Sequence, residues 1–143
     1  MTKSVLPSTQ SLLRTAGLQE TKARSLVVET LRHSKKPLSP YDIQKRIGAK
    51  GKAVNTVTVY RIIDALQKNN VVHRHPSSGH FLLCAMPQKQ GCHAFLHCSS
   101  CGNIEEFHNE KLCKMQNDIA RESGYTPEHH VTEIVGICSA CKE

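Results

Sequence analysis

Several features that define common protein classes are absent from this chain. Trp does not occur, and aromatic residues make up 4% of the 143 residues, which argues against a carbohydrate-binding or base-stacking surface built from many rings. The apolar runs are only a few residues long, whereas a membrane-spanning helix needs about 20 apolar residues. No apolar stretch flanked by basic residues opens the sequence, so we see no secretory signal and expect a cytoplasmic protein with no membrane partner.

Sequence motifs of the common enzyme classes are also missing. We find no Gly-x-Ser-x-Gly, His-Glu-x-x-His, Walker or dinucleotide-binding pattern. The sequence therefore predicts a protein that is not an enzyme, has no catalytic residues and has no small-molecule substrate.

The residues that are abundant are basic residues, cysteine and histidine. The net charge is +7, with seven Cys and nine His. Residues 1–84 hold 14 basic and 4 acidic residues, a balance of +10, whereas residues 85–143 have a balance of −3 and six of the cysteines. In a reducing cytosol cysteines bind metal more often than they pair. We predict a basic module that meets a polyanion and a Cys/His-rich module that binds metal.

The domain boundary is expected where periodicity stops. Met86–Gly91 contains Pro, Gly and polar residues, which are typical of a linker. We assign residues 1–84 to a basic first domain, 85–91 to a hinge and 92–143 to a Cys/His-rich second domain. The fold class is α+β.

The basic half has the pattern of short helices followed by a β-hairpin. Periodicity and capping residues predict helices over 8–17, 21–34, 39–47 and 56–68, then strands over 71–75 and 80–84. This order is the plan of a winged helix-turn-helix. In that motif the second helix enters the major groove of DNA and its first residues reach base edges.

The start of the 56–68 segment carries the residues that would contact DNA. Its apolar positions fall on one helical face, which leaves a polar face outward. That face includes Thr56, Thr58, Tyr60 and Arg61. Arginine can make a bidentate contact to guanine, and tyrosine can reach a phosphate or a thymine methyl group. A face that only meets water would show the same pattern, so these residues alone leave both interpretations open.

Two Cys-x-x-Cys pairs give the most specific signal. They are Cys98/Cys101 and Cys138/Cys141, with 36 residues between them. Each pair can present two thiolates from one turn, and four thiolates complete a tetrahedral zinc shell with no open position. We therefore predict a structural zinc site. A redox Cys-x-x-Cys is the rival interpretation, but it needs only one such motif, between a strand and a helix.

The rest of the Cys/His-rich half predicts a small α/β unit. Strands are expected over 94–98, 103–107 and 131–138, with a helix over 109–123. A sheet of so few strands has open edges, so two copies could pair edge to edge as a twofold dimer. Further potential ligands are numerous, and as a group they predict a second metal site. They are His73, His75, His80, Cys84, Cys92, His93, His97, Glu105, Glu106, His108, Cys113, His129 and His130.

From about residue 10 to Cys141 the chain resembles the Fur family of metal-responsive bacterial repressors. The resemblance rests on Thr58-Val59-Tyr60-Arg61, on the segment from Cys98 to Phe107, and on the final Gly136-Ile137-Cys138-x-x-Cys141. It implies a winged-helix DNA-binding domain, a hinge and a dimerisation domain with a structural four-cysteine zinc.

Within the family, the residues look closest to the zinc-sensing subgroup, Zur. The positions that resemble its regulatory zinc ligands are His73, Cys84, His93 and Glu106. One thiolate, two imidazoles and one carboxylate suit Zn²⁺ better than Fe²⁺ or Mn²⁺. Where iron sensors of the family carry metal ligands, this chain has Pro37, Ala94 and Phe95, which argues against an iron or peroxide sensor.

The resemblance implies two further sets of residues. A third metal site of many family members maps onto Cys92, Cys113 and His130, which could be a thiolate-rich zinc site or simply buried cysteines. Tyr41, Tyr60 and Arg61 of this chain resemble residues that contact DNA in the zinc-sensing subgroup.

These observations predict a dimeric repressor that binds palindromic double-stranded operator DNA when zinc is bound and controls zinc-uptake genes. About two zinc ions are expected per chain. The alternative is a relative that senses iron, manganese, nickel or peroxide. A zinc-ribbon module without DNA binding would have no reason for the +10 first half.

Overall fold

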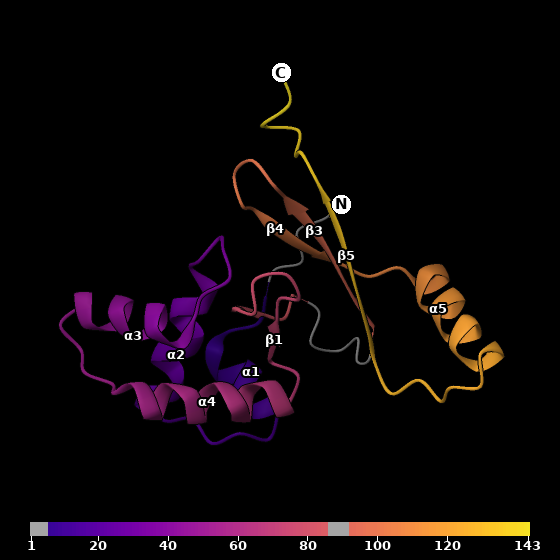
Figure 1. Ribbon diagram of the computed structural model, residues 1–143. Helices are drawn as coiled ribbons and strands as arrows, with labels where there is room; N and C mark the ends of the chain where they lie inside the picture. The colour runs from indigo at the N-terminus through magenta and orange to yellow at the C-terminus, as the bar shows by residue number, and fades with distance from the viewer. Residues whose placement is uncertain (1–5, 86–91) are drawn as a thin grey trace. The chain divides into compact units, whose positions relative to one another are not determined.

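The computed structural model describes residues 6–85 and 92–143. The chain divides into two compact units, Met1–Ala85 and Met86–Glu143. Of the predicted hinge 85–91, all but Ala85 lies outside the described residues. The first unit is helical with a small hairpin and the second is built on a sheet, which confirms the predicted α+β class (Figure 1).

Four helices form the body of the first unit. They are α1 (Thr9–Thr15), α2 (Lys22–Arg32), α3 (Pro40–Ala49) and α4 (Thr56–Lys68). The start of α3 has a capping box, because the side chains of Ser39 and Asp42 accept hydrogen bonds from each other's backbone amides. This helix continues to Ala49, beyond the predicted end at Ile47. The turn that follows contains Gly51, whose φ of +75° favours glycine.

The apolar faces of these helices meet in one core. The apolar face predicted for the 56–68 segment is buried in α4, where it consists of Val59, Ile62, Ile63 and Leu66. Val27 and Val28 from α2 and Ile43 and Ile47 from α3 pack into the same cluster. Because α2, α3 and α4 share this core, α3 and α4 hold the helix-turn-helix arrangement that the sequence predicts.

A short hairpin follows α4. Strand β1 (Val72–Arg74) pairs antiparallel with β2 (Phe81–Leu83). Leu38 bridges to Phe81 through two backbone hydrogen bonds of 2.8 Å, so the segment before α3 extends the wing. No pattern in the sequence predicts this third element of the wing.

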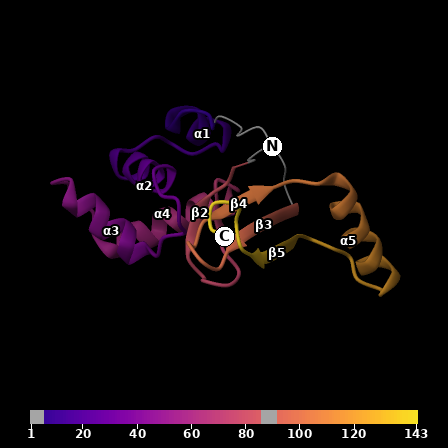
Figure 2. The same ribbon diagram turned by 90° about the horizontal axis from the view of Figure 1, so that it is seen from above.

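The second unit is a three-stranded sheet with one helix. Its strands are β3 (Cys92–Cys98), β4 (Ile104–Phe107) and β5 (His130–Gly136), in the order β4-β3-β5. Strand β3 pairs antiparallel with β4 and parallel with β5. Figure 2 shows the same three strands side by side from above. Since β5 is an edge strand, it leaves one row of backbone groups available for further pairing.

Helix α5 (Glu110–Glu122) connects β4 with β5 and stands away from the strands in both views (Figures 1 and 2). None of its residues is buried within the single chain. Met115 and Ile119, which lie one helical turn apart on α5, are 59% and 56% exposed. The apolar side chains of α5 therefore have no cover among residues 6–85 and 92–143.

Residues 6–85 and 92–143 include no helix with the length and apolar character needed to cross a membrane.

Candidate functional site

The four cysteines of the two Cys-x-x-Cys pairs converge at one end of the sheet. The Sγ atoms of Cys98, Cys101, Cys138 and Cys141 lie within 4.8 Å of one another. A zinc–sulfur distance of about 2.3 Å requires neighbouring sulfurs about 3.8 Å apart in a tetrahedron. The Sγ atoms of Cys101 and Cys138 are 3.9 Å apart, so the donors and the spacing both fit a tetrahedral metal ion.

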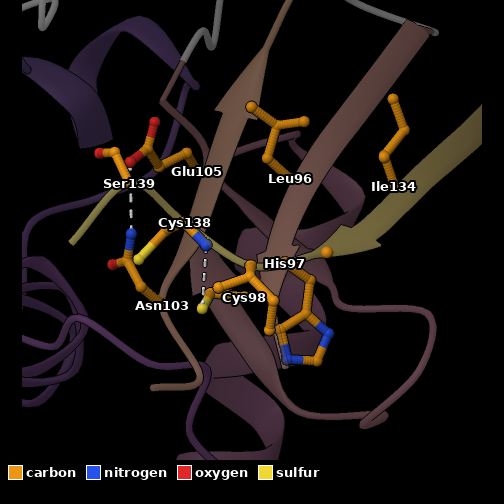
Figure 3. A pocket seen from close by; sticks show the side chains of 10 residues that line it. Leu96, His97, Cys98, Asn103, Glu105, Ile134, Cys138 and Ser139 are labelled. Carbon is orange, nitrogen blue, oxygen red and sulfur yellow. Dashed lines mark hydrogen bonds between the residues drawn. The ribbon is translucent and has the colours of Figure 1, made fainter. Parts of the chain in front are cut away.

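Backbone hydrogen bonds shape the two turns that carry these sulfurs. After β3, the Gly102 amide donates to the Cys98 carbonyl at 2.8 Å, and Gly102 has a φ of +74°, where a side chain would be strained. After β5, the Cys141 amide donates to the Cys138 carbonyl at 3.0 Å. The Cys138 amide also donates to Cys98 Sγ at 3.3 Å, which links the two turns (Figure 3).

The electrostatics of the cluster favour a bound cation. Amide hydrogen bonds, first from Cys101 and then from Cys138, lower the pKa of Cys98 to about 6. For Cys141, the Ser100 side chain lowers the pKa, but the neighbouring thiols outweigh it and raise the value to about 11. Four thiolates cannot ionise together unless a cation offsets their repulsion.

The residues predicted as regulatory ligands occupy both units, two in each. In the first unit His73 lies on β1, and Cys84 follows β2 and is buried. The Cys84 amide donates to the Val71 carbonyl at 2.8 Å. Leu82 pairs with His73, and Cys84 follows two residues later, opposite Val71. Since side chains two residues apart on a strand share a face, His73 and Cys84 lie on the same face of the wing as diagonal neighbours.

In the second unit His93 and Glu106 face each other. His93 lies on β3 and Glu106 on β4, and His93 Nδ1 is 3.0 Å from Glu106 Oε1. Their side chains are only 9% and 2% exposed. A buried imidazole beside a buried carboxylate provides two of the donors that zinc accepts. Each unit thus holds a pair of neighbouring donors from the predicted set.

The third predicted site contains a bond that the sequence analysis did not foresee. Cys92, at the start of β3, and Cys113, in the first turn of α5, form a disulfide with their Cα atoms 6.0 Å apart. His130 is the register partner of Cys92 on β5. Disulfide sulfurs are not thiolate ligands, so a metal shell at this position requires the reduced pair. His108, at the end of β4, also lies beside these two sulfurs.

The predicted DNA-contacting residues lie on α3 and the first turns of α4. Tyr41 and Tyr60 are 64% and 53% exposed, and Arg61 is exposed. Thr58 is half-buried. The Thr56 hydroxyl donates to Gln44 Oε1 at 2.5 Å, so this side chain joins α3 to α4.

Sequence reasoning missed one exposed residue on this face. Val57 is 59% exposed at the start of α4, where a methyl group can meet a thymine methyl group. The sequence did contain a sign of this exposure, because Val57 is an apolar residue that does not fall on the apolar face of the helix.

Other predicted ligands have structural partners. His75 is fully buried, and its Nδ1 lies 2.8 Å from the Ser78 hydroxyl in the turn of the wing. His97 Nδ1 is 3.1 Å from Glu133 Oε1, across β3 and β5.

A family model and a similar protein identify the same family. The model of the ferric uptake regulator family matches residues 15–135. A ferric uptake regulation protein of Legionella pneumophila is 31% identical over 131 residues, which cover 91% of this chain and 96% of the relative.

Solved structures of zinc regulators share the fold. The holo form of XcZur superposes with a TM-score of 0.83 at 27% identity, covering 93% of this chain and 95% of that one. A zinc uptake regulator solved with zinc and DNA superposes with a TM-score of 0.80 at 26% identity, covering 95% and 96%. The curated relative is named for iron and these structures for zinc, so the names leave the metal open. The chain belongs to the ferric uptake regulator family, whose members are metal-responsive transcription regulators.

Proposed function

We propose that this protein is a zinc-responsive transcriptional repressor. In this proposal it binds palindromic operator DNA as a homodimer when zinc is bound, and it controls zinc-uptake genes. Cys98, Cys101, Cys138 and Cys141 hold a structural zinc, and His73, Cys84, His93 and Glu106 hold the regulatory zinc.

The observation that carries the choice of zinc is the thiolate among the regulatory ligands. Cys84 is held beside His73 on one face of the wing. A soft sulfur donor selects Zn²⁺ over the harder Fe²⁺ and Mn²⁺ ions. Two positions that carry metal ligands in iron-sensing relatives are Ala94 and Phe95 here. Their side chains have no donor atom, are 2% and 0% exposed and pack in the sheet, which also supports zinc.

Regulation follows from the division of the ligands between the units. His73 and Cys84 belong to the first unit, and His93 and Glu106 belong to the second. One ion bound by all four residues would restrict the orientation of the DNA-binding unit relative to the dimerisation unit. The ion would then select the conformer that fits the operator, and operator binding would raise the affinity for zinc by the same factor.

The proposed dimer is supported by apolar surface on the second unit. Met115 and Ile119 on α5 and Ile134 and Val135 on β5 are each more than half exposed. An exposed apolar helix face and an exposed edge strand are surfaces that a second copy of the chain could cover. A twofold dimer through these elements would present two copies of α4 to the two halves of a palindrome.

DNA recognition is assigned to the exposed start of α4. Arg61 and Tyr60 would contact bases and the backbone, with Thr58, Thr56 and Tyr41 beside them. The balance of +10 over residues 1–84 supplies the attraction to phosphates. The third set, Cys92, Cys113 and His130, stays a prediction that applies only to the reduced chain.

The residue assignments are tested by zinc-dependent operator binding. Fluorescence anisotropy on a selected palindrome should show tight binding with zinc for the wild type. We expect Cys84→Ser and His93→Ala to lose the zinc response while remaining folded dimers. His33→Ala is the matched control, because the His33 side chain is 69% exposed on the first unit. Zinc-stimulated binding that persists in both ligand variants would contradict the assignment.

The second candidate is a regulator of the same family that senses iron, manganese, nickel or peroxide. The name of the Legionella relative favours it. It differs from the first proposal in which divalent ion restores DNA binding to the metal-free protein.

A further inference from the structure

The disulfide lies at the junction between the sheet and α5. Cys92 begins β3, and Cys113 is in the first turn of α5, 21 residues further along the chain. A hydrogen bond from Gln116 to the Thr132 hydroxyl lies on the same side of the sheet. Because α5 buries no residue within the chain, a covalent bond at its first turn strongly restricts where the helix can lie.

Two histidine rings adjoin this bond. A ring nitrogen of His108 and both sulfurs lie within 4.8 Å of one another. His130 stands beside Cys92 in the parallel register, so the two side chains share a face of the sheet. Cys92, Cys113, His108 and His130 together line one open hollow of about 500 Å³.

Both rings have a buried nitrogen that lacks a protein partner. Within residues 6–85 and 92–143, His108 Nδ1 and His130 Nε2 are buried and accept or donate no hydrogen bond. Burying such a nitrogen without a partner costs free energy. His108 lies beside both sulfurs, whereas His130 adjoins Cys92 from the neighbouring strand. Once the S–S bond is broken, the two sulfurs and the two unpartnered nitrogens would supply the S₂N₂ donor set that zinc binds in tetrahedral sites.

We propose that Cys92, Cys113, His108 and His130 form a redox-controlled zinc site. The same two sulfurs either join as a disulfide or, when reduced, bind a zinc ion together with the two histidines. The oxidised state has no zinc at this position, and the reduced state has one zinc more than the structural and regulatory ions. In both states the first turn of α5 remains fastened to the start of β3.

The chemistry of the switch balances with a hydroperoxide as oxidant. One zinc-bound thiolate attacks the peroxide oxygen, which breaks the O–O bond and gives a sulfenic acid and an alcohol. The second thiolate then attacks the sulfenic sulfur, forming the S–S bond and releasing water. Overall, the zinc dithiolate, one ROOH and two protons give the disulfide, ROH, H₂O and free Zn²⁺. A small dithiol reverses the step by thiol–disulfide exchange. Cys92 and Cys113 are only half-buried, so both reagents can reach them.

The site extends the proposed function but can fail independently of it. Cys92 precedes the proposed regulatory ligand His93, and α5 is part of the proposed dimer surface. Even so, the redox and zinc-binding behaviour of this site needs no DNA. Zinc content and thiol state therefore test the switch, whereas operator binding tests the repressor.

The experiment compares the full-length wild type with Cys113→Ser. Each protein is reduced, loaded with zinc, freed of excess metal and then treated with one equivalent of a hydroperoxide. Bound zinc is counted by mass spectrometry of the metal, and alkylated peptides identify which cysteines have been oxidised. We expect three zinc ions per reduced wild-type chain and two after oxidation, with a Cys92–Cys113 disulfide peptide. Cys113→Ser should bind two zinc ions before and after.

A histidine variant separates the metal site from the disulfide. His108→Ala should weaken the third zinc at least about tenfold in a chelator competition but still form the disulfide. His129→Ala is its matched control, because His129 is an exposed residue that lines the same hollow. Circular dichroism checks that each variant is folded.

Two results would overturn the proposal. One is an equal zinc count in reduced wild type and folded Cys113→Ser. The other is a hydroperoxide-treated wild type in which Cys92 and Cys113 stay alkylated separately. If the zinc counts are as expected but operator binding ignores zinc, the switch stands and the repressor proposal fails.

Discussion

Removal of the metal from the four-cysteine cluster should unfold the second unit and leave the first unit folded. The two units differ in how much apolar core they contain. Among the described residues, the buried hydrophobic cluster of the first unit runs from Leu12 to Leu83 across its helices and wing. In the second unit the buried hydrophobic residues are Ala94, Phe95 and Cys98.

The magnitudes favour the metal as the main stabilising element of that unit. Complete burial of the Phe95 side chain stabilises by about 3 kcal/mol, and the Ala94 methyl group adds about 0.8 kcal/mol. A structural zinc site contributes on the order of 10 kcal/mol to the folding of a small domain. The metal contribution is therefore more than twice that of the fully buried side chains.

Hydrogen exchange measured by mass spectrometry distinguishes the units. With a strong chelator, amides of β3, β4 and β5 should exchange at least about a thousandfold faster, because the loss of free energy exceeds 4 kcal/mol. Amides of α2 and α4 should keep their protection. Cys98→Ser should behave as the chelated protein does, whereas Cys84→Ser should keep both units protected. Persistent protection of β3–β5 after the metal analysis shows no zinc would refute the reasoning.

Three further predictions concern the first unit. Arg61→Ala should weaken operator binding by about 1–3 kcal/mol and relax the base preference at one position; unchanged affinity across an operator library would remove Arg61 from the interface. Ile63→Ala should lower the free energy of unfolding by about 2–5 kcal/mol in urea, because Ile63 is 1% exposed, whereas Val57→Ala on the same helix should change it by less than about 0.5 kcal/mol. Hydrogen bonds from the backbone amide of Ser39, and then from its hydroxyl, lower the pKa of Asp42 in the folded protein. The ionised carboxylate therefore stabilises the fold at pH values above its unfolded pKa. This stabilisation is lost as the pH falls through the lower pKa of the folded state. Asp42→Asn should therefore lower the melting temperature at pH 7 but not in strong acid, and an equal loss at both pH values would point to another cause.

The sequence predicted the elements whose signals are local. The helix over 56–68 matches α4 because Asn55 caps it and its apolar positions repeat every three or four residues. The two Cys-x-x-Cys turns could be paired because their chemistry has one common solution, a four-sulfur metal site. These features need no knowledge of distant contacts.

What the sequence did not predict depends on contacts between distant segments. The bridge from Leu38 to Phe81 has no local pattern, because a single bridging residue leaves no alternation. The Cys92–Cys113 disulfide depends on where α5 begins relative to β3, which spacing alone cannot give. Met115 and Ile119 have a core-like pattern yet remain exposed, because periodicity records an apolar face without recording what covers it.

The central claim is that zinc controls DNA binding, and metal add-back tests it most directly. The protein is stripped of its regulatory metal under reducing conditions and titrated into a palindromic operator with Zn²⁺, Fe²⁺ or Mn²⁺ at matched free concentrations. We predict that Zn²⁺ alone restores tight binding, since one regulatory ligand is a thiolate. Equal restoration by Fe²⁺ or Mn²⁺, or binding that ignores all three ions, would contradict the account.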